Sequence, residues 1–319
     1  MPVLHRYHSV VPLQPSDYKE YQGVMFSALY PPEDIRALQG FQVRDDDVFI
    51  ASYPRSGSTW MEEIVSLIFN GGDVSRVATV PVYERVPCLE ERPVGTRVPN
   101  RRLLDAAPGP RVMKTRLPWS MVPPQVRQGK GKVVYLARNP KDTCNSLYHF
   151  HRMSRCHVTP ESWAEFFFHF VEGKVEFGSW FDHILGWQTH ASTYPTKMLF
   201  VKYEDLHKDP HMVVARVAQF LSRPLSPQTV DTVVKHCRFD NMKANPMTNY
   251  SNDDRFDFNQ SEFLRTGTVA NWKKFFLVIN SLDFDRIYAE RMQASGLQFD
   301  YDRTGEFGAD RDLEDYCFR

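Results

Sequence analysis

Residues 49–70 read FIASYPRSGSTWMEEIVSLIFN and predict a strand, a short polar loop and a helix. The preceding charged residues and Pro54 bound an apolar, β-rich run, which is typical of a buried strand. We expect the helix to begin with Ser58 or Thr59 as N-cap and to end at Gly71-Gly72, with Glu62 and Glu63 in its first turn. An apolar face formed by Met61, Ile64, Val65 and Ile68 predicts that the helix packs on a sheet.

Further segments of the chain repeat this alternation of strand and helix. Strands are predicted at 132–137, 198–206 and 111–118, and helices after Asn139-Pro140 and over about 209–221. A short helix capped by Gly40 is expected near residue 32. Alternating strands and helices indicate one α/β domain with a central parallel sheet flanked by helices. Residues 245–270 are polar and irregular, as in a functional lid or a disordered segment.

The composition of the chain bounds its class. With 319 residues, 42% of them hydrophobic, the chain can bury a substantial core. Its formal net charge of +0 argues against bulk binding to nucleic acid or to a membrane surface. No signal-like apolar segment and no run of roughly 18 apolar residues is present in the sequence. The five scattered cysteines form no C-x-x-C pair, so we expect free thiols and a cytoplasmic location.

Three separated elements have the composition of anion sites. In the first loop, Gly57 permits close approach of an anion, which the backbone N–H groups and the helix N-terminus attract. Ser58, Thr59 and Arg55 add hydrogen-bond donors. An ordinary capped helix start is the alternative for this loop. Arg138 with Ser146 after the second strand, and Arg265 with Gly267 in FLRTG, could hold a second phosphate. Three such elements suit a nucleoside with phosphates at both ends.

The motifs identify a family resemblance. YPRSGSTW is similar to the 5′-phosphosulfate loop of the cytosolic sulfotransferases, usually Y-P-K-S-G-T-T-W, and ARNPKDTCNSLYHF to their 3′-phosphate element. FLRTGTVANWKKFF resembles their R-K-G-x-x-G-D-W-K element, and EGKVEFGSWFDHILGW, VKYEDL and MKANPMTNY also match family segments. The resemblance implies a P-loop NTPase-like sulfotransferase fold in one domain, 1–319, with a core at about 23–299. An acidic tail, about 305–319, is expected to be mobile.

The resemblance implies a donor, 3′-phosphoadenosine 5′-phosphosulfate (PAPS), its product PAP, and a small-molecule acceptor, with no metal. The residues implied for the nucleotide are Arg55, Ser56, Gly57, Ser58, Thr59, Trp60, Arg138, Ser146, Tyr203, Phe239, Met242, Phe263, Arg265, Thr266 and Gly267. Trp60 would stack on the adenine, while core packing is the alternative for Tyr203, Phe239 and Met242. The catalytic residues implied are Arg55, Lys114, Arg116 and Ser146. Sulfuryl transfer of this kind depends on positioning and charge stabilisation.

Two positions depart from the family in the expected catalytic centre. Arg55 replaces the loop lysine, a change that preserves a donor and a charge. Arg116 replaces the histidine of K-T-H-L-P that takes the acceptor proton, and an arginine with a pKa above about 12 cannot be that base. Loss of a general base typically costs about 10²–10⁴-fold in rate. Three hypotheses follow. The protein binds the nucleotide without catalysis, or it uses acceptors that ionise unaided beside Arg116, or another residue such as His157 or His151 is the base. For His151, a solvated position on a helix is the simpler expectation.

The implied acceptor pocket is unusually polar. Its residues are Cys88, Glu91, Lys114, Arg116, Phe150 and His157, and Cys156 also replaces an apolar family residue. We therefore expect a polar or charged small acceptor, sulfated on oxygen or nitrogen. Cys237 stands where the family usually has a threonine, and Leu277 and Leu282 replace two residues of the family dimer patch, so that dimer is not expected. A phosphate-loop kinase is the remaining alternative, but it would need a loop lysine and an acidic magnesium ligand.

Overall fold

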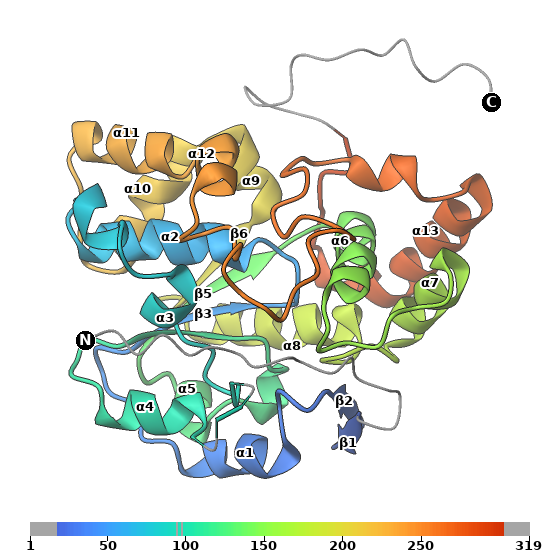
Figure 1. The fold of residues 1–319 in the computed structure, drawn as a ribbon, viewed down its shortest axis with the longest axis horizontal. Helices are drawn as coiled ribbons and strands as arrows, with labels where there is room; N and C mark the ends of the chain where they lie inside the picture. Colours follow the sequence, from blue (N-terminus) through green and yellow to red (C-terminus); the bar gives the residue numbers. More distant parts are fainter. Residues whose placement is uncertain (1–17, 94, 97, 303–319) are drawn as a thin grey trace.

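Four parallel strands form the central sheet of the computed structural model, in the order β4-β3-β5-β6. Figure 1 labels three of them, β3, β5 and β6, near the middle of the molecule. The structure describes residues 18–93, 95–96 and 98–302. In the register, Ile50 of β3 pairs with Lys114 of β4 on one side and with Val134 of β5 on the other. The predicted central parallel sheet is confirmed. The strands are β3 Val48–Ser52, β4 Val112–Thr115, β5 Lys132–Ala137 and β6 Met198–Lys202, beside an antiparallel pair, β1 Lys19–Tyr21 and β2 Val24–Phe26.

Helices cover both faces of this sheet, and alternate strand residues belong to two different cores. Ile50 and Val134 pack in a core with apolar residues of α2, α10 and α11. Phe49 and Tyr135 face the opposite core, which takes in residues of α6, α7 and α8. The α-helices are α1 Pro32–Ala37, α2 Ser58–Phe69, α3 Val82–Arg85, α4 Asn100–Ala106, α5 Pro124–Arg127, α6 Pro140–Met153, α7 Trp163–Glu172, α8 Trp180–Thr193, α9 Tyr203–Lys208, α10 Pro210–Phe220, α11 Pro227–His236, α12 Phe239–Ala244 and α13 Val278–Met292.

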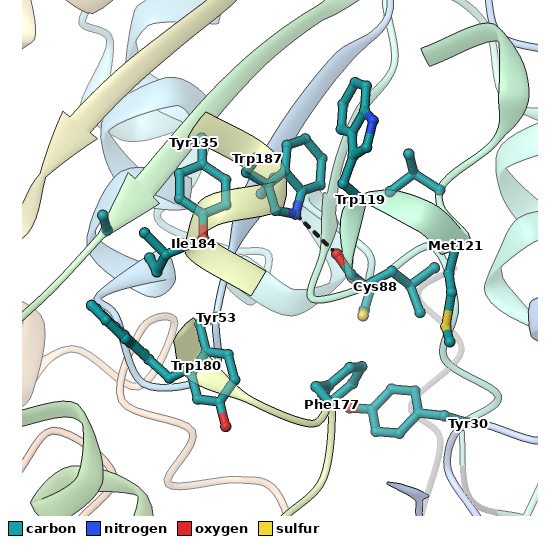
Figure 2. Packing of buried hydrophobic residues seen from close by; sticks show 14 of the residues in the cluster. Tyr30, Tyr53, Cys88, Trp119, Met121, Tyr135, Phe177, Trp180, Ile184 and Trp187 are labelled. Atoms are coloured by element: carbon teal, nitrogen blue, oxygen red, sulfur yellow. Dashed lines mark hydrogen bonds between the residues drawn. The ribbon is translucent and has the colours of Figure 1, made fainter. Parts of the chain in front are cut away.

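The second core fixes the strand end that carries the predicted catalytic segment. Trp187 of α8 donates from Nε1 to the Leu117 carbonyl oxygen at 3.1 Å (Figure 2). His183, one turn earlier, lies 2.8 Å from the Tyr135 hydroxyl through Nδ1 and 3.0 Å from the Arg116 carbonyl oxygen through Nε2. Burial lowers the pKa of His183 to about 4, so this imidazole is neutral at physiological pH. These bonds hold the backbone after β4 in place.

Three sequence predictions about local structure are wrong. The strands predicted over 198–206 and 111–118 end early: the first at Lys202, where the chain turns into α9, and the second at Thr115. Gly57, in the left-handed conformation at φ 95°, is the N-cap of α2 in place of Ser58 or Thr59, and no side chain caps this helix. Glu62 and Glu63 lie in its second turn and are fully buried, because each has a basic partner inside the protein.

Residues 246–270 contain neither a helix nor a regular strand, but they pack over the carboxyl end of the sheet. Tyr250, Phe256 and Phe263 form a small buried cluster with Val82 and Met153. Asp142 of α6 fixes the end of the segment by accepting hydrogen bonds from the Ala270 and Trp272 N–H groups at 2.9 and 2.8 Å. Of the two alternatives for this segment, disorder is therefore wrong, and a role as a functional lid stays a prediction.

The C-terminal part of the chain bears on two further predictions. Four apolar residues at the start of α13 are exposed: Leu277, Val278, Ile279 and Leu282. Their exposure does not test the expected loss of the family dimer, which stays a prediction. The predicted mobile tail, about 305–319, lies outside the described residues. None of the helices within the described ranges combines the length and the apolar character needed to span a bilayer.

Candidate active site

One cavity of about 970 Å³ opens between the carboxyl ends of the strands and residues 246–270, the segment that packs over them. It is lined by every residue that the sequence assigned to the nucleotide or the acceptor, with one exception. The exception is Ser56, whose fully buried side chain does not face the cavity. The fold therefore brings together residues that lie as far as 212 positions apart in the sequence, from Arg55 to Gly267.

The first loop presents its backbone and Arg55 to one end of the cavity. Arg55 has a positive φ of 66°, and its Nε donates to Ser146 Oγ at 3.1 Å. Its second terminal nitrogen donates to the Phe263 carbonyl oxygen at 2.8 Å, and the guanidinium packs on the rings of Phe150 and Phe263. No side chain caps α2, and its first residues, Ser58 to Trp60, line the cavity, so free N–H groups at this helix end are available to an anion there.

Two further arginines reach the same end of the cavity. Arg138 donates to the Arg55 and Thr268 carbonyl oxygens at 3.2 and 3.1 Å and packs over the ring of Tyr203. Its Nε is buried without a hydrogen-bond partner. Arg265 donates to Asn271 Oδ1 at 2.8 Å. A buried guanidinium N–H that lacks an acceptor is costly unless a ligand satisfies it.

The protein balances the positive charges at this end only in part: Asp142 lies 3.9 Å from Arg138 and faces three arginines. The pKa of Arg55 is lowered to about 9 by burial and by the neighbouring charges of Arg138, Arg265 and Arg116. Burial and Arg138 also lower the pKa of Arg265. Like charges held together in this way favour a polyanionic ligand, which would offset their repulsion.

Aromatic side chains lie next to these charges. Trp60 packs edge-to-face on Tyr203, with ring centroids 5.7 Å apart, and on His207. A Cβ on Gly57 would lie 2.6 Å from a Tyr203 ring carbon, and one on Gly267 would lie 2.0 Å from Phe239. Glycine at both positions therefore lets the aromatic rings approach the backbone that lines the cavity.

At the other end of the cavity, Lys114 is held in a buried ion pair. Its Nζ lies 3.0 Å from Glu62 Oε2 and 3.2 Å from the Tyr250 hydroxyl. Burial opposes the charge of Lys114, but Glu62 and Tyr250 raise its pKa above the ordinary value. Lys114 is therefore a charged donor and not a base.

Arg116 lies nearby with neutral partners. Its guanidinium donates to the Tyr30 hydroxyl at 3.2 Å and lies 3.4 Å from Cys88 Sγ, while its backbone N–H donates to Glu90. Burial opposes its charge, yet Tyr30, Cys88 and the acidic neighbours raise the pKa of Arg116 further. Arg116 therefore cannot take a proton from an acceptor.

Glu91 belongs to a second buried charge network that the sequence did not reveal. Its Oε1 lies 2.6 Å from Arg255, which also forms hydrogen bonds with both carboxylate oxygens of Asp253. Burial opposes ionisation of Glu91, but Arg255 and Arg116 lower its pKa, so it is a carboxylate. The alternative of a solvated loop residue for Glu91 is wrong. Charged residues within the polar 245–270 segment were the only sequence signal for Arg255 and Asp253.

The two histidines considered as replacement bases differ in their surroundings. His157 is buried between Ser154 and Glu176, each 2.7 Å from one of its ring nitrogens. His151 is also buried, and burial with the neighbouring His157 lowers its pKa to about 3. The expectation that His151 is solvated is therefore wrong: its Nδ1 is 3.2 Å from the Val158 carbonyl oxygen, and it does not line the cavity.

Comparison with known proteins identifies the family. The model of the sulfotransferase domain matches residues 45–296. Sulfotransferase 1A1 of Canis lupus familiaris is 40% identical over 272 residues, which cover 85% of this chain and 91% of that protein. Sulfotransferase 1C2 of Rattus norvegicus is 39% identical over 268 residues, covering 82% and 88%.

Solved structures show the same architecture. Mouse sulfotransferase SULT7A1, solved in complex with PAP, superposes with a TM-score of 0.72 at 28% identity, covering 87% of this chain and 95% of that one. A retinol dehydratase, in complex with androsterone and the inactive cofactor PAP, shares the fold with a TM-score of 0.80 at 24% identity, covering 91% and 97%. The chain therefore belongs to the sulfotransferase family, and it is an enzyme that transfers a sulfuryl group from PAPS to a small-molecule acceptor.

Proposed function

We propose that the arginine-rich end of the cavity holds PAPS and that the end around Lys114 and Arg116 holds a small polar acceptor. The observation that carries this proposal is the convergence of three arginines, Arg55, Arg138 and Arg265, on one cavity with a buried Arg138 Nε that lacks a partner. With Asp142 as the carboxylate beside Arg138, the three arginines still leave an excess of positive charge, which favours a polyanion as the occupant.

The residues present fit a nucleoside with phosphate groups at both ends. The first loop, from Arg55 to Trp60, would hold the 5′ side with its backbone N–H groups. Arg138, Ser146, Arg265, Thr266 and Gly267 would hold the 3′-phosphate. The adenosine would be surrounded by Trp60, Tyr203, Phe239, Met242 and Phe263. Because Gly57 and Gly267 have no Cβ, the rings of Tyr203 and Phe239 can lie close to the backbone at these two positions.

Charge stabilisation is the role we assign to the catalytic residues. When bound, PAPS supplies the activated sulfuryl group. Arg55, Lys114 and Ser146 donate hydrogen bonds where negative charge develops on the leaving oxygen, in a buried site where such bonds are strong. The pair with Glu62 keeps Lys114 charged and in position.

Arg116 takes a different role from the histidine that it replaces. As a permanent cation among neutral partners, it stabilises an acceptor oxygen that is already ionised or ionises easily. No observation on the described residues favours the hypothesis of a silent nucleotide-binding protein. We also propose a cytosolic location, which the four described cysteines, all unpaired thiols, support.

Transfer of labelled sulfate from PAPS to two phenols tests this proposal. The nitro group of 4-nitrophenol acidifies the hydroxyl so that it ionises near neutral pH, whereas 4-propylphenol has a pKa of about 10, like tyrosine. We expect the wild type to prefer 4-nitrophenol strongly, and Arg116→His to raise transfer to 4-propylphenol by about 10²-fold or more.

Two results would contradict the proposal. If the wild type transfers to neither phenol while Arg116→His transfers to both, the chain binds the nucleotide without a catalytic role for Arg116. If the wild type treats the two phenols alike, another group acts as the base. Binding of PAP, measured by calorimetry on both proteins, separately checks the nucleotide end.

A further inference from the structure

His207 lies in the wall of the nucleotide end, although no sequence motif marked it. It follows Tyr203 by one turn of the short helix α9 and lines the same cavity. Its ring Nε2 is buried and has no hydrogen-bond partner among the described residues. A buried polar atom in this state is uncommon, because it has lost its hydrogen bond to water and has gained none in return. This nitrogen is therefore available to a ligand in the cavity.

Two aromatic side chains hold the imidazole in place. The centroid of its ring lies 5.0 Å from that of Trp60 and 4.7 Å from that of Tyr203, and both contacts are edge-to-face. The guanidinium of Arg138 packs over the same Tyr203 ring, 4.3 Å from its centroid. His207 is thus a direct neighbour of two rings that the proposed function places around the adenosine.

The charge state of His207 limits what its free nitrogen can bind. Burial and the charge of Arg138 lower the pKa of His207 to about 4, so the imidazole is neutral at physiological pH. A neutral imidazole has one N–H and one nitrogen with a free lone pair. Because the nucleotide end carries an excess of positive charge, the lone pair is the more favourable group to present there. The partner of Nε2 is then a neutral hydrogen-bond donor and not a phosphate group, which offers acceptors.

The side chains already assigned to the adenosine do little to distinguish one base from another. Trp60, Phe239 and Phe263 can pack on any base, since every base has a π-face. Cys237 also lines the cavity, but a thiol is only a weak donor. Adenine carries an exocyclic amino group, a donor, where guanine carries a carbonyl oxygen. An acceptor fixed beside Trp60 would therefore distinguish adenine by this amino group.

We propose that His207 selects the base of the nucleotide, with Nε2 accepting a hydrogen bond from the exocyclic amino group of adenine. His207 then touches PAPS itself, and it recognises the donor of the sulfuryl group, not the acceptor. Trp60 and Tyr203 keep the imidazole in the orientation that this bond requires. This inference rests on the proposed function, since it adds a contact to the nucleotide that this end would hold.

Calorimetric binding of two nucleotides tests this role: PAP, and purine riboside 3′,5′-bisphosphate, which has a hydrogen in place of the amino group. Both are measured on the wild type, His207→Phe and His207→Gln. The first variant keeps an aromatic ring against Trp60 and Tyr203 without a ring nitrogen, and the second restores an acceptor on a flexible side chain. His211→Phe is the control, because His211 is an exposed histidine of α10 that pairs with Asp231 and does not line the cavity.

We expect the wild type and His211→Phe to bind PAP about tenfold more tightly than the analogue, as one buried hydrogen bond would give. His207→Phe should bring this ratio close to unity by weakening the binding of PAP, and His207→Gln should restore part of it. A ratio that His207→Phe leaves unchanged, or an equal weakening of both nucleotides, would overturn base selection by His207. Failure of PAP itself to bind the wild type would instead count against the proposed function.

Discussion

The two ends of the cavity handle buried charge in opposite ways. At the nucleotide end, Arg55, Arg138 and Arg265 face one another, and their repulsion contributes to the lowered pKa of Arg55. At the acceptor end, Lys114 pairs with Glu62, and Arg255 pairs with Glu91 and Asp253. Each partner of a buried pair stabilises the other's charged form, so this end is polar without large net charge.

This difference indicates what each end needs from a ligand. The nucleotide end has more arginines than counter-charges, since Asp142 pairs with Arg138, and a polyanion would complete it, so we expect its ligand to be recognised mainly by charge. The acceptor end is complete by itself, so an acceptor must match hydrogen-bonding groups that are already fixed. Removing a charge should therefore destabilise the empty protein much more at the acceptor end than at the nucleotide end.

Breaking the pair at the acceptor end should have the largest effect. Glu62→Gln leaves Lys114 buried without its carboxylate, and we expect the free energy of unfolding to fall by about 3–5 kcal/mol. Denaturation by urea, without ligand, measures this. Glu290→Gln is the control, because its exposed pair with Arg286 should contribute no more than about 1 kcal/mol. Equal losses in both variants would mean that the acceptor end is not stabilised by pairing.

Removing a charge at the nucleotide end should instead reduce affinity with little loss of stability. Arg138→Met keeps an apolar side chain over Tyr203 but removes the guanidinium, so PAP should bind at least about 30-fold more weakly. Without ligand, the melting temperature should change little, because relief of the repulsion from Arg55 and Arg265 offsets the lost hydrogen bonds to two carbonyl oxygens and the lost pair with Asp142. Arg223→Met, which removes a guanidinium stacked on Phe69 outside the cavity, is the calorimetric control. A large drop in the stability of empty Arg138→Met would erase the contrast between the two ends.

The same contrast explains how far the sequence could predict this site. Anion-binding elements are local, a strand end followed by a glycine loop and a helix, so Arg55, Gly57 and Arg138 could be found from short motifs. The parallel direction of the strands also follows from the alternation of strands and helices, whereas their order, β4-β3-β5-β6, does not. Pairing partners such as Arg255 for Glu91, or Glu176 for His157, lie 164 and 19 residues apart, and no local pattern marks them. The buried position of His151 and the bend of the chain into α9 depend on tertiary packing for the same reason.

The smallest effect should come from the backbone that shapes the nucleotide end. Gly57→Ala adds a methyl group 2.6 Å from a Tyr203 ring carbon, at a φ of 95°, so we expect PAP affinity to fall about tenfold as the ring and the loop shift. Gly23→Ala is the matched control: it also has a positive φ, 78°, but its methyl group would meet nothing within 4 Å. Both variants should lose about 1 kcal/mol of stability to the left-handed conformation. Gly57→Ala should lose more than that because its methyl group overlaps Tyr203, and it alone should lose affinity. If calorimetry finds PAP binding equally strong in the two variants, close approach of the loop backbone is not part of nucleotide recognition, and the charges of the arginines alone account for it.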